Sequence, residues 1–403
     1  MGKKASLKDL GISTILVKAW WSMLYLGIFV FGKHIPLPFA KLQTGQVNPL
    51  LVATGGDSSQ ASLFSLGISP WMSAMIIIGM LAQLRLPMMS KMTERKMDLG
   101  QKTLTFFLTV IQAAVMLREF QLIDNGFGSR LAAGLFLMAG SFLLIWLSVE
   151  NDKNGLGGIS LILMANMFFT LMKSFANGLI PGLSAQSANI VRALALFVIL
   201  LLGAVTVILT NAERRVPVTK LLISAEFGSE SYLPIRILPA GSMPAMFATT
   251  MFVLPKYILQ FFYNLSNWKF FKVLANAFDL SQVSGLILYC LILVGLTYGF
   301  SYISIDPVQQ ADDMQKSGDY IPGCRPGKET ERYLRHLINI FSFVSSIYFV
   351  LFTGLPLGLT LLDAKLSSLV MLPNYVIILA GFGAAIAEQI EVLQIRAQYR
   401  GLL

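Results

Sequence analysis

Apolar and polar residues occupy long alternating blocks along this chain. Segments of roughly 20 mostly apolar residues recur from one end to the other, and a helix needs about 20 such residues to cross the hydrocarbon of a bilayer. The pattern therefore predicts ten membrane-spanning helices, at residues 14–32, 66–84, 103–121, 131–149, 159–178, 193–211, 239–261, 283–305, 336–354 and 369–390.

Composition supports a polytopic membrane protein. Of the 403 residues, 55% are hydrophobic and only 13% are charged, whereas a soluble domain has about 25% charged residues. The apolar residues are spread over the whole length, so a single anchor helix does not account for them. The predicted fold class is an all-α polytopic membrane protein.

The basic residues indicate an orientation. If the N-terminal tail lies inside, the predicted cytoplasmic segments hold about twice as many Lys and Arg residues as the external ones. This is the bias that orients membrane proteins, and it accounts for most of the net charge of +10. We therefore expect a multi-pass protein of the cell membrane with both termini in the cytoplasm. Basic loops also suit an acidic partner or a ribosome.

The sequence argues against catalysis and ion coupling. The middles of the predicted spans contain no Asp or Glu, which ion-coupled transporters usually place there. The stretch "GCRPGKE" is too short between Gly323 and Gly327 for a phosphate-binding loop, and Glu329 replaces the required hydroxyl. Two histidines and the two cysteines, Cys290 and Cys324, are too few and too scattered for a metal site or a disulfide framework. We expect no enzyme activity, no cofactor and no metal, so any ATP-driven work must come from a partner.

One predicted external segment has two readings. Residues 47–71, "VNPLLVATGGDSSQASLFSLGISPW", are too polar near Gly55 to cross lipid, yet carry no charge except Asp57. Irregular backbone at membrane depth requires surrounding protein or a water-filled cavity. The segment is either a re-entrant element inside a cavity or an ordinary external loop.

Several stretches, in order, carry a family resemblance. They are "LFSLGISPWMSAMII" (63–77), "NGLGGISLIL" (154–163), "NAERRVPV" (211–218), "YLPIRILPAGSMPAMFATT" (232–250), "DPVQQADDMQKSGDYIPGCRPGKETERYL" (306–334) and "QIEVLQIRAQYRG" near the C-terminus. Together they resemble SecY, the protein-conducting channel of the general secretory pathway. The resemblance covers essentially the whole chain.

The resemblance implies two inverted five-helix halves around a central pore, at residues 1–180 and 190–403. A plug at about 47–65 would close the external funnel, with Gly55, Gly56, Ser58 and Ser59 in it. An apolar ring, which dewets when empty, would consist of Ile68, Met72, Ile159, Leu163, Met246 and Ile378. Spans 66–84 and 239–261 would line a lateral gate. Cytoplasmic loops 212–238 and 306–335 would bind the motor ATPase through Arg214, Arg215, Arg325 and Lys328.

Departures from the family pattern favour one branch. The C-terminal tail is short, the entry to the fifth predicted span reads "NGLGG", Cys324 replaces an isoleucine, and two ring positions are methionine. This is similar to the accessory SecY of some Gram-positive bacteria, which exports serine-rich glycosylated adhesins. It implies an accessory SecA-type ATPase, small SecE- and SecG-like subunits, unfolded preprotein and membrane lipid as partners, without direct nucleic-acid binding. Alternatives are a housekeeping SecY, a small-solute secondary transporter, and a membrane scaffold or insertase.

Overall fold

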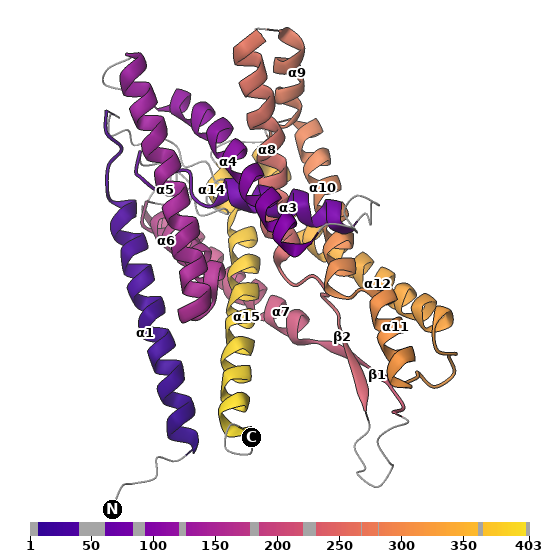
Figure 1. Cartoon of the computed structure of the whole chain (residues 1–403). Helices are drawn as coiled ribbons and strands as arrows, with labels where there is room; N and C mark the ends of the chain where they lie inside the picture. The colour runs from indigo at the N-terminus through magenta and orange to yellow at the C-terminus, as the bar shows by residue number, and fades with distance from the viewer. Residues whose placement is uncertain are drawn as a thin grey trace, which may run out of the picture.

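The computed structural model describes residues 7–39, 61–83, 93–120, 126–177, 185–220, 231–266, 268–280, 282–361 and 366–399. Long helices dominate these residues (Figure 1). The longer helices are α1 Leu7–Lys33, α3 Ser69–Gln83, α4 Glu94–Glu119, α5 Phe127–Asn154, α6 Gly158–Asn177, α7 Ala185–Asn211, α8 Met243–Ser266, α10 Val283–Ser304, α12 Lys328–Phe349 and α15 Leu372–Tyr399. The shorter elements are β1 Glu213–Pro217, β2 Tyr232–Arg236, α9 Lys269–Ala277, α11 Pro307–Ser317, the π-helix η2 Val350–Gly354, α13 Leu355–Gly358, the 3-10 helix η3 Leu359–Leu361 and α14 Ser367–Val370.

Nine helical segments among the described residues are long and apolar enough to cross a membrane. Each predicted span overlaps a helix, but the second coincides with α3, which has only 15 residues. These 15 described residues, which are followed by the undescribed range 84–92, are fewer than the roughly 20 that a full crossing needs. The multi-pass prediction is confirmed, and the count of ten full-length spans is not.

The sixth predicted span begins earlier than expected. Its helix, α7, starts at Ala185, so residue 190 lies inside a helix and not in a connecting loop. The polar residues of "AQSAN" at the start of α7 extend the helix beyond its apolar part. Hydropathy locates the apolar part of a helix, whereas backbone hydrogen bonding sets where the helix begins.

Residues 212–238 contain a β-hairpin, which corrects the all-α prediction. Strands β1 and β2 pair antiparallel, with Arg214 opposite Ile235 and Val216 opposite Leu233. Val216 and Ile235 are buried while their neighbours along each strand are more exposed. Along β2, burial alternates with the period of two that one covered face of a strand produces, whereas β1 has Val216 as its one buried residue.

Much of the predicted loop 306–335 is helical. Helix α11 begins after Asp306, whose carboxylate accepts hydrogen bonds from the backbone N–H groups of Val308 and Gln309. It ends at Gly318, which adopts the left-handed conformation (φ 76°) typical of a glycine after a helix. Helix α12 then begins at Lys328, so only about residues 318–327 are non-helical.

The hairpin and the 306–335 region pack into one body at one end of the molecule (Figure 1). The backbones of Thr219 and Tyr320 exchange two hydrogen bonds, at 2.8 and 3.1 Å. A separate apolar cluster fills the space between them, formed by Val216, Ile235, Met314, Ile321, Leu334 and Leu337. We call this body, comprising residues 213–220, 231–236 and 307–337, the loop module.

The main core lies between the long helices. Its buried side chains come from α1, α3, α5, α6, α7, α8, α10, α12 and α15. Helix α12 continues into the π-helical turn η2, where Gly354 lies against α10. A Cβ atom at Gly354 would lie 2.9 Å from the Cys290 sulfur. The glycine therefore permits close approach of the two helices at this turn.

Candidate functional site

The six predicted ring residues belong to one apolar cluster. Met72, Leu163, Met246 and Ile378 come from four different helices, α3, α6, α8 and α15, and Ile68 immediately precedes α3. These five are buried, with exposed fractions between 0% and 5%. Ile159, at the start of α6, is half-buried and packs against the same cluster.

Two of the helices that carry predicted ring residues, α8 and α15, approach each other at a glycine. Gly381 of α15 lies against Ser242, directly before α8, so closely that a Cβ atom there would overlap the serine hydroxyl. Met246 follows Ser242 by about one turn, and Ile378 precedes Gly381 by about one turn. The contact therefore sets Met246 and Ile378 at similar depth in the molecule.

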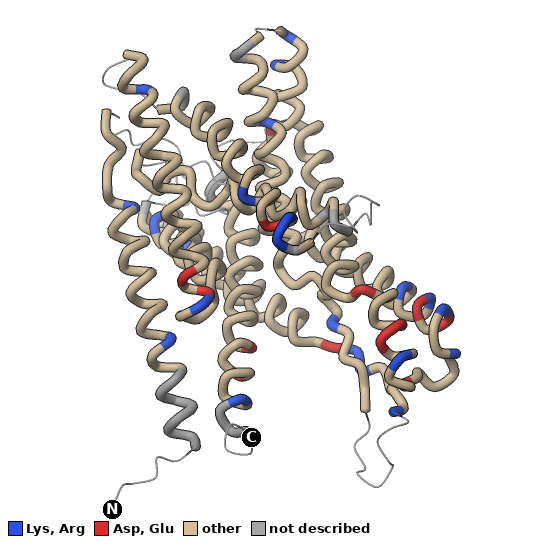
Figure 2. The backbone as a smooth tube through the Cα atoms, in the orientation of Figure 1, with Lys and Arg blue, Asp and Glu red and all other residues tan. Residues whose placement is uncertain are grey.

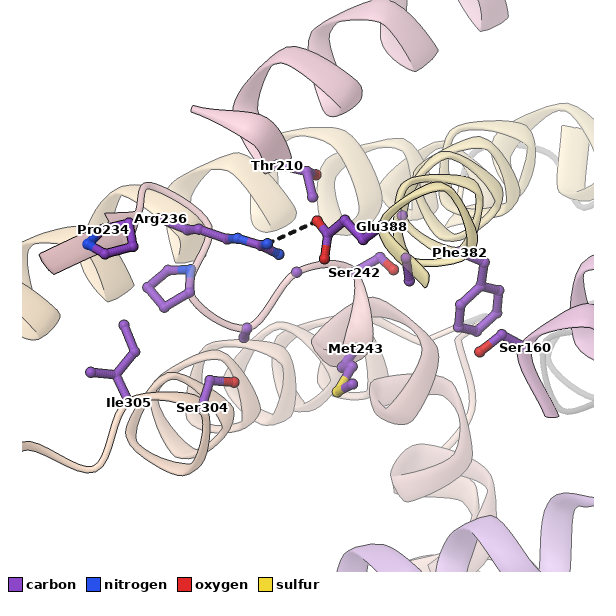
Figure 3. A pocket seen from close by; sticks show the side chains of 15 residues that line it. Ser160, Thr210, Pro234, Arg236, Ser242, Met243, Ser304, Ile305, Phe382 and Glu388 are labelled. Carbon is purple, nitrogen blue, oxygen red and sulfur yellow. Dashed lines mark ion pairs between the residues drawn. The ribbon is translucent and has the colours of Figure 1, made fainter. Parts of the chain in front are cut away.

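A cavity of about 530 Å³ flanks the ring on the side of the loop module. Three of its lining residues lie three or four positions from predicted ring residues: Ser160 before Leu163, Met243 before Met246, and Phe382 after Ile378 (Figure 3). Strand β2 and the end of α10 close its outer wall through Pro234, Arg236, Ser304 and Ile305.

An ion pair stands at the wall of this cavity. The Arg236 guanidinium lies 2.8 Å from the Glu388 carboxylate and joins β2 to α15 (Figure 3). Both side chains are about half exposed, at 47% and 41%, so solvent screens their attraction. The pair places one charge of each sign beside an otherwise apolar and hydroxyl-lined space.

A buried lysine lies on the opposite side of the ring. Lys33, in the last turn of α1, donates a hydrogen bond of 2.8 Å to the side-chain oxygen of Asn166 on α6. Lys33 is 7% exposed and Asn166 is fully buried. Asn166 follows Leu163 by three residues, so this contact lies about one turn beyond the ring.

The glycine-rich entry to α6 is held by a cluster of buried hydrogen bonds around Asn151, which we call the polar knot. Asn151 of α5 donates to the carbonyls of Leu156 and Gly158, and its side-chain oxygen accepts from the Ser22 hydroxyl of α1. The Leu156 N–H donates back to Ser22. A Cβ atom at Gly155 would overlap the Asn151 oxygen. The divergent "NGLGG" sequence thus forms a compact turn that ties α1, α5 and α6 together.

This turn also contacts the C-terminal helix. Gly157 takes a left-handed conformation (φ 73°), and its N–H donates to the Gln389 side chain of α15 at 2.7 Å. Gln389 lies next to Glu388, whose ion pair borders the cavity. The entry to α6 is therefore connected to the ring helix α15.

The four predicted motor-binding residues all lie in the loop module and are exposed. Arg214 and Arg215 project from β1, and Arg215 lies over the ring of Tyr232 and pairs with Glu213. Glu329 and Thr330 at the start of α12 hydrogen-bond to the Arg325 backbone and hold the intervening turn. Figure 2 shows Lys and Arg residues interspersed with Asp and Glu residues at this end of the molecule.

Part of the predicted plug lies outside the described residues. Gly55, Gly56, Ser58 and Ser59 fall in the undescribed range 40–60. The adjoining residues 61–66 are described: Phe64 stacks on Phe29 of α1 with ring centroids 6.2 Å apart. The predicted gate helices α3 and α8 contact each other, and both contact α4.

Sequence reasoning missed three features of this site. They are the Ser22–Asn151 hydrogen bond, the Lys33–Asn166 hydrogen bond and the Arg236–Glu388 ion pair. Each joins two residues that are more than 120 positions apart in the sequence. Helical periodicity places residues on faces but does not pair distant helices. A usable signal was the isolated Asn or Lys within an apolar segment, because buried polar side chains need partners.

Comparison with known proteins identifies the family. The sequence model of SecY matches residues 62–383. The chain belongs to the SecY family. The match includes every ring position and both long loops of this SecY-family chain.

Relatives with curated descriptions are similar over nearly the full length. The accessory Sec system protein translocase subunit SecY2 of Streptococcus sanguinis is 34% identical, with 96% of this chain and 98% of that protein covered. The SecY2 of Streptococcus salivarius is 31% identical, with 98% and 100% covered.

Solved structures show the same fold. "The structure of a protein conducting channel" superimposes with a TM-score of 0.68 at 16% identity and covers 95% of this chain and 93% of that chain. "Sec61 in the Canine ribosome-channel complex from the endoplasmic reticulum" gives a TM-score of 0.61 at 15% identity, with the same coverage.

Proposed function

We propose that this chain is the channel subunit of an accessory Sec translocase that exports unfolded preproteins across a bacterial cell membrane. The observation that carries the proposal is the 34% identity to an accessory SecY2 over 96% of the chain. The apolar cluster at the centre of the long helices and the cavity beside it are consistent with a closed pore. Serine-rich glycosylated adhesins are the proposed clients.

The proposed architecture is that of the family. Ten spans, with α3 as a short second span, form halves at residues 1–180 and 190–403, and both termini face the cytoplasm. Inverted repeats place the working site near the midplane, between the halves. The plug at about 47–65 closes the side of the ring opposite the loop module.

The ring seals the pore in this proposal. Ile68, Met72, Ile159, Leu163, Met246 and Ile378 form a constriction that excludes water and ions while empty. Methionine side chains are unbranched and adapt to varied neighbours, so Met72 and Met246 suit a seal that must fit around many different side chains. The cavity of about 530 Å³ is the space through which a client segment reaches the ring.

The loop module is the proposed docking surface for an accessory SecA-type ATPase. Arg214, Arg325 and Lys328 have no ion-pair partner among the described residues, so their charges are available to an acidic surface. The turn that carries Arg325 is fixed by its bonds to α12, and a preorganised turn loses little conformational freedom on binding. Small SecE- and SecG-like subunits complete the assembly.

Binding of the motor tests the proposal. The detergent-solubilised chain is used to capture SecA-type ATPases from the native membrane extract, comparing wild type with Arg325→Glu. Arg130→Glu is the matched control, because Arg130 is also exposed but lies on α5, outside the loop module. We expect capture of the accessory ATPase by wild type and by the control, with a loss of at least roughly tenfold for Arg325→Glu, the effect of one charge-assisted contact.

Other outcomes reject the proposal in different ways. Capture of the housekeeping ATPase alone reassigns the chain to general secretion. Capture of neither ATPase supports a scaffold or insertase. Equal capture by wild type and Arg325→Glu, with the accessory ATPase bound, keeps the function and rejects the Arg325 docking site.

A further inference from the structure

Two buried polar side chains next to the predicted ring have no hydrogen-bond partner in the part of the chain that the structure describes. Thr250 and Asn374 are 1% and 2% exposed. The Thr250 hydroxyl and both polar atoms of the Asn374 amide have no hydrogen-bond partner among the described residues. Buried polar groups are almost always hydrogen-bonded, so each exception calls for an explanation.

Their positions relate directly to the ring. Thr250 follows Met246 by four residues on α8, and Asn374 precedes Ile378 by four residues on α15. Residues four apart share a helix face, so Thr250 and Asn374 stand on the ring-facing sides of their helices, one turn from the ring.

Both lie on the same side of the ring. The cavity is lined by Met243, which precedes Met246 on α8, and by Phe382, which follows Ile378 on α15. Thr250 and Asn374 lie in the opposite directions, away from the cavity. Asn166, which follows Leu163 on α6, lies on this side too, but Lys33 already occupies its oxygen.

The Thr250 hydroxyl differs from most helical threonine hydroxyls in this molecule. The hydroxyls of Thr105, Thr109, Thr170, Thr206, Thr210 and Thr297 each donate to the carbonyl four residues earlier. The adjacent Thr249 donates to the Met246 carbonyl at 2.6 Å. Thr250 makes neither kind of bond, so its hydrogen-bonding capacity is unused.

An extended polypeptide supplies the missing partners. Every peptide unit except at proline carries one N–H donor and one C=O acceptor, and neither finds a partner within an apolar ring. The asparagine amide offers both a donor and an acceptor, and the threonine hydroxyl can act as either. Thr250 and Asn374 therefore match the peptide groups of a chain that has just passed the ring.

We propose that Thr250 and Asn374 form a binding site for backbone peptide groups of the client as it leaves the ring. The inference rests on the proposed function and adds a substrate-contacting site to it. The site gives the emerging backbone its first hydrogen bonds after the ring and lowers the barrier to each forward step. Because it contacts the backbone, it acts on clients regardless of their side chains.

The test is transport of a preprotein into vesicles that contain the chain with its small subunits, driven by its SecA-type ATPase. The double variant Thr250→Val/Asn374→Leu keeps side-chain volume and removes the polar atoms. We expect its transport rate to fall roughly three- to tenfold, the equivalent of about one hydrogen bond, while its melting temperature is unchanged or higher. Thr249→Val is the control, because that buried hydroxyl is already bonded, and it should transport at the wild-type rate.

Two further variants separate substrate contact from packing. Thr250→Ser keeps the hydroxyl and should transport faster than Thr250→Val, even if the double variant folds poorly. Equal rates for these two single variants would overturn the proposal. A double variant with the wild-type rate would also overturn it, and would leave the polar pair as a site for water alone.

Two client probes test the chemical class of the ligand. One preprotein carries a serine-rich passenger, and the other carries the same passenger with each serine replaced by alanine. Equal slowing of both by the double variant supports backbone recognition, whereas slowing of only the serine-rich passenger rejects it. Wild-type vesicles that transport neither passenger would reject the proposed function itself.

Discussion

Asn151 illustrates how one polar residue fixes a turn that the apolar pattern leaves undefined. It is fully buried and its side chain satisfies two carbonyls while accepting from Ser22. Asn151→Ala removes these hydrogen bonds and leaves the Gly158 carbonyl without its side-chain partner, whereas the Ser22 hydroxyl can still donate to the Leu156 carbonyl. A buried polar group left unsatisfied costs about 1–3 kcal/mol. We expect a clear drop in the melting temperature of the purified chain.

A neighbouring asparagine provides the control for this prediction. Asn154 is exposed, and among the described residues its side chain bonds only to Glu150, one turn away on the same helix. Asn154→Ala should leave the melting temperature nearly unchanged. If the two variants have the same melting temperature, the hydrogen bonds around Asn151 do not contribute to stability.

The proposed ring residues and the hydrogen bonds around Asn151 differ in whether the sequence could suggest them. The ring positions follow from the SecY resemblance, and the four-residue spacings of Ile68 and Met72 and of Ile159 and Leu163 fit one helix face. The knot depends on Ser22 meeting Asn151, which are 129 residues apart. No local pattern encodes that meeting, so only the three-dimensional structure reveals it.

At the scale of elements, helix α11 could have been predicted. "DPVQQADDMQKSG" begins with an Asp that caps the helix, continues with Pro at the first helical position and ends with Gly318. These are the start and stop signals of a helix. The SecY resemblance implied one cytoplasmic loop over residues 306–335 and no helix within it. The β-hairpin was missed because its paired strands have only five residues each.

The Asp306 cap gives a prediction at this scale. Asp306→Ala removes the acceptor for the N–H groups of Val308 and Gln309, which lie 3.0 and 3.2 Å away. Loss of a helix N-cap costs about 1 kcal/mol, so the amides of α11 should exchange with deuterium several-fold faster while those of α10 are unchanged.

Asp312→Ala serves as the control, because Asp312 is an exposed residue within α11. Its amides should exchange at close to the wild-type rate. Equal acceleration in both variants would mean that general loss of negative charge, and not the cap, determines the stability of α11.

At the scale of the whole molecule, the Arg236–Glu388 pair connects the loop module to α15, which carries the proposed ring residue Ile378. Because both groups are about half exposed, we expect their coupling to be below about 1 kcal/mol and to weaken with added salt. A double-mutant cycle of melting temperatures with Arg236→Gln and Glu388→Gln, at low and high salt, measures it. The more exposed Lys102–Asp98 pair within α4, at 69% and 60%, is a reference for a pair that solvent screens more strongly. A large, salt-independent coupling would indicate a desolvated pair.

A charge placed in the proposed ring distinguishes a channel from a membrane scaffold. Met72 is 1% exposed in the central cluster, at a proposed ring position on α3. In a channel, Met72→Asp hydrates the constriction, because a dewetted pore closes only while its lining is apolar. Planar bilayers containing the variant should then conduct ions where wild type is silent.

A buried residue of a helix outside the ring provides the comparison. Leu144 of α5 is fully buried in the same cluster, so Leu144→Asp carries a similar cost of burying a charge without lining the proposed pore. It should destabilise the chain and leave the bilayer silent. If Met72→Asp likewise only destabilises, the apolar cluster is ordinary helix packing and the ring assignment fails. If Met72→Asp conducts ions and Leu144→Asp does not, the seal depends on the side chain at position 72 and not on apolar packing in general.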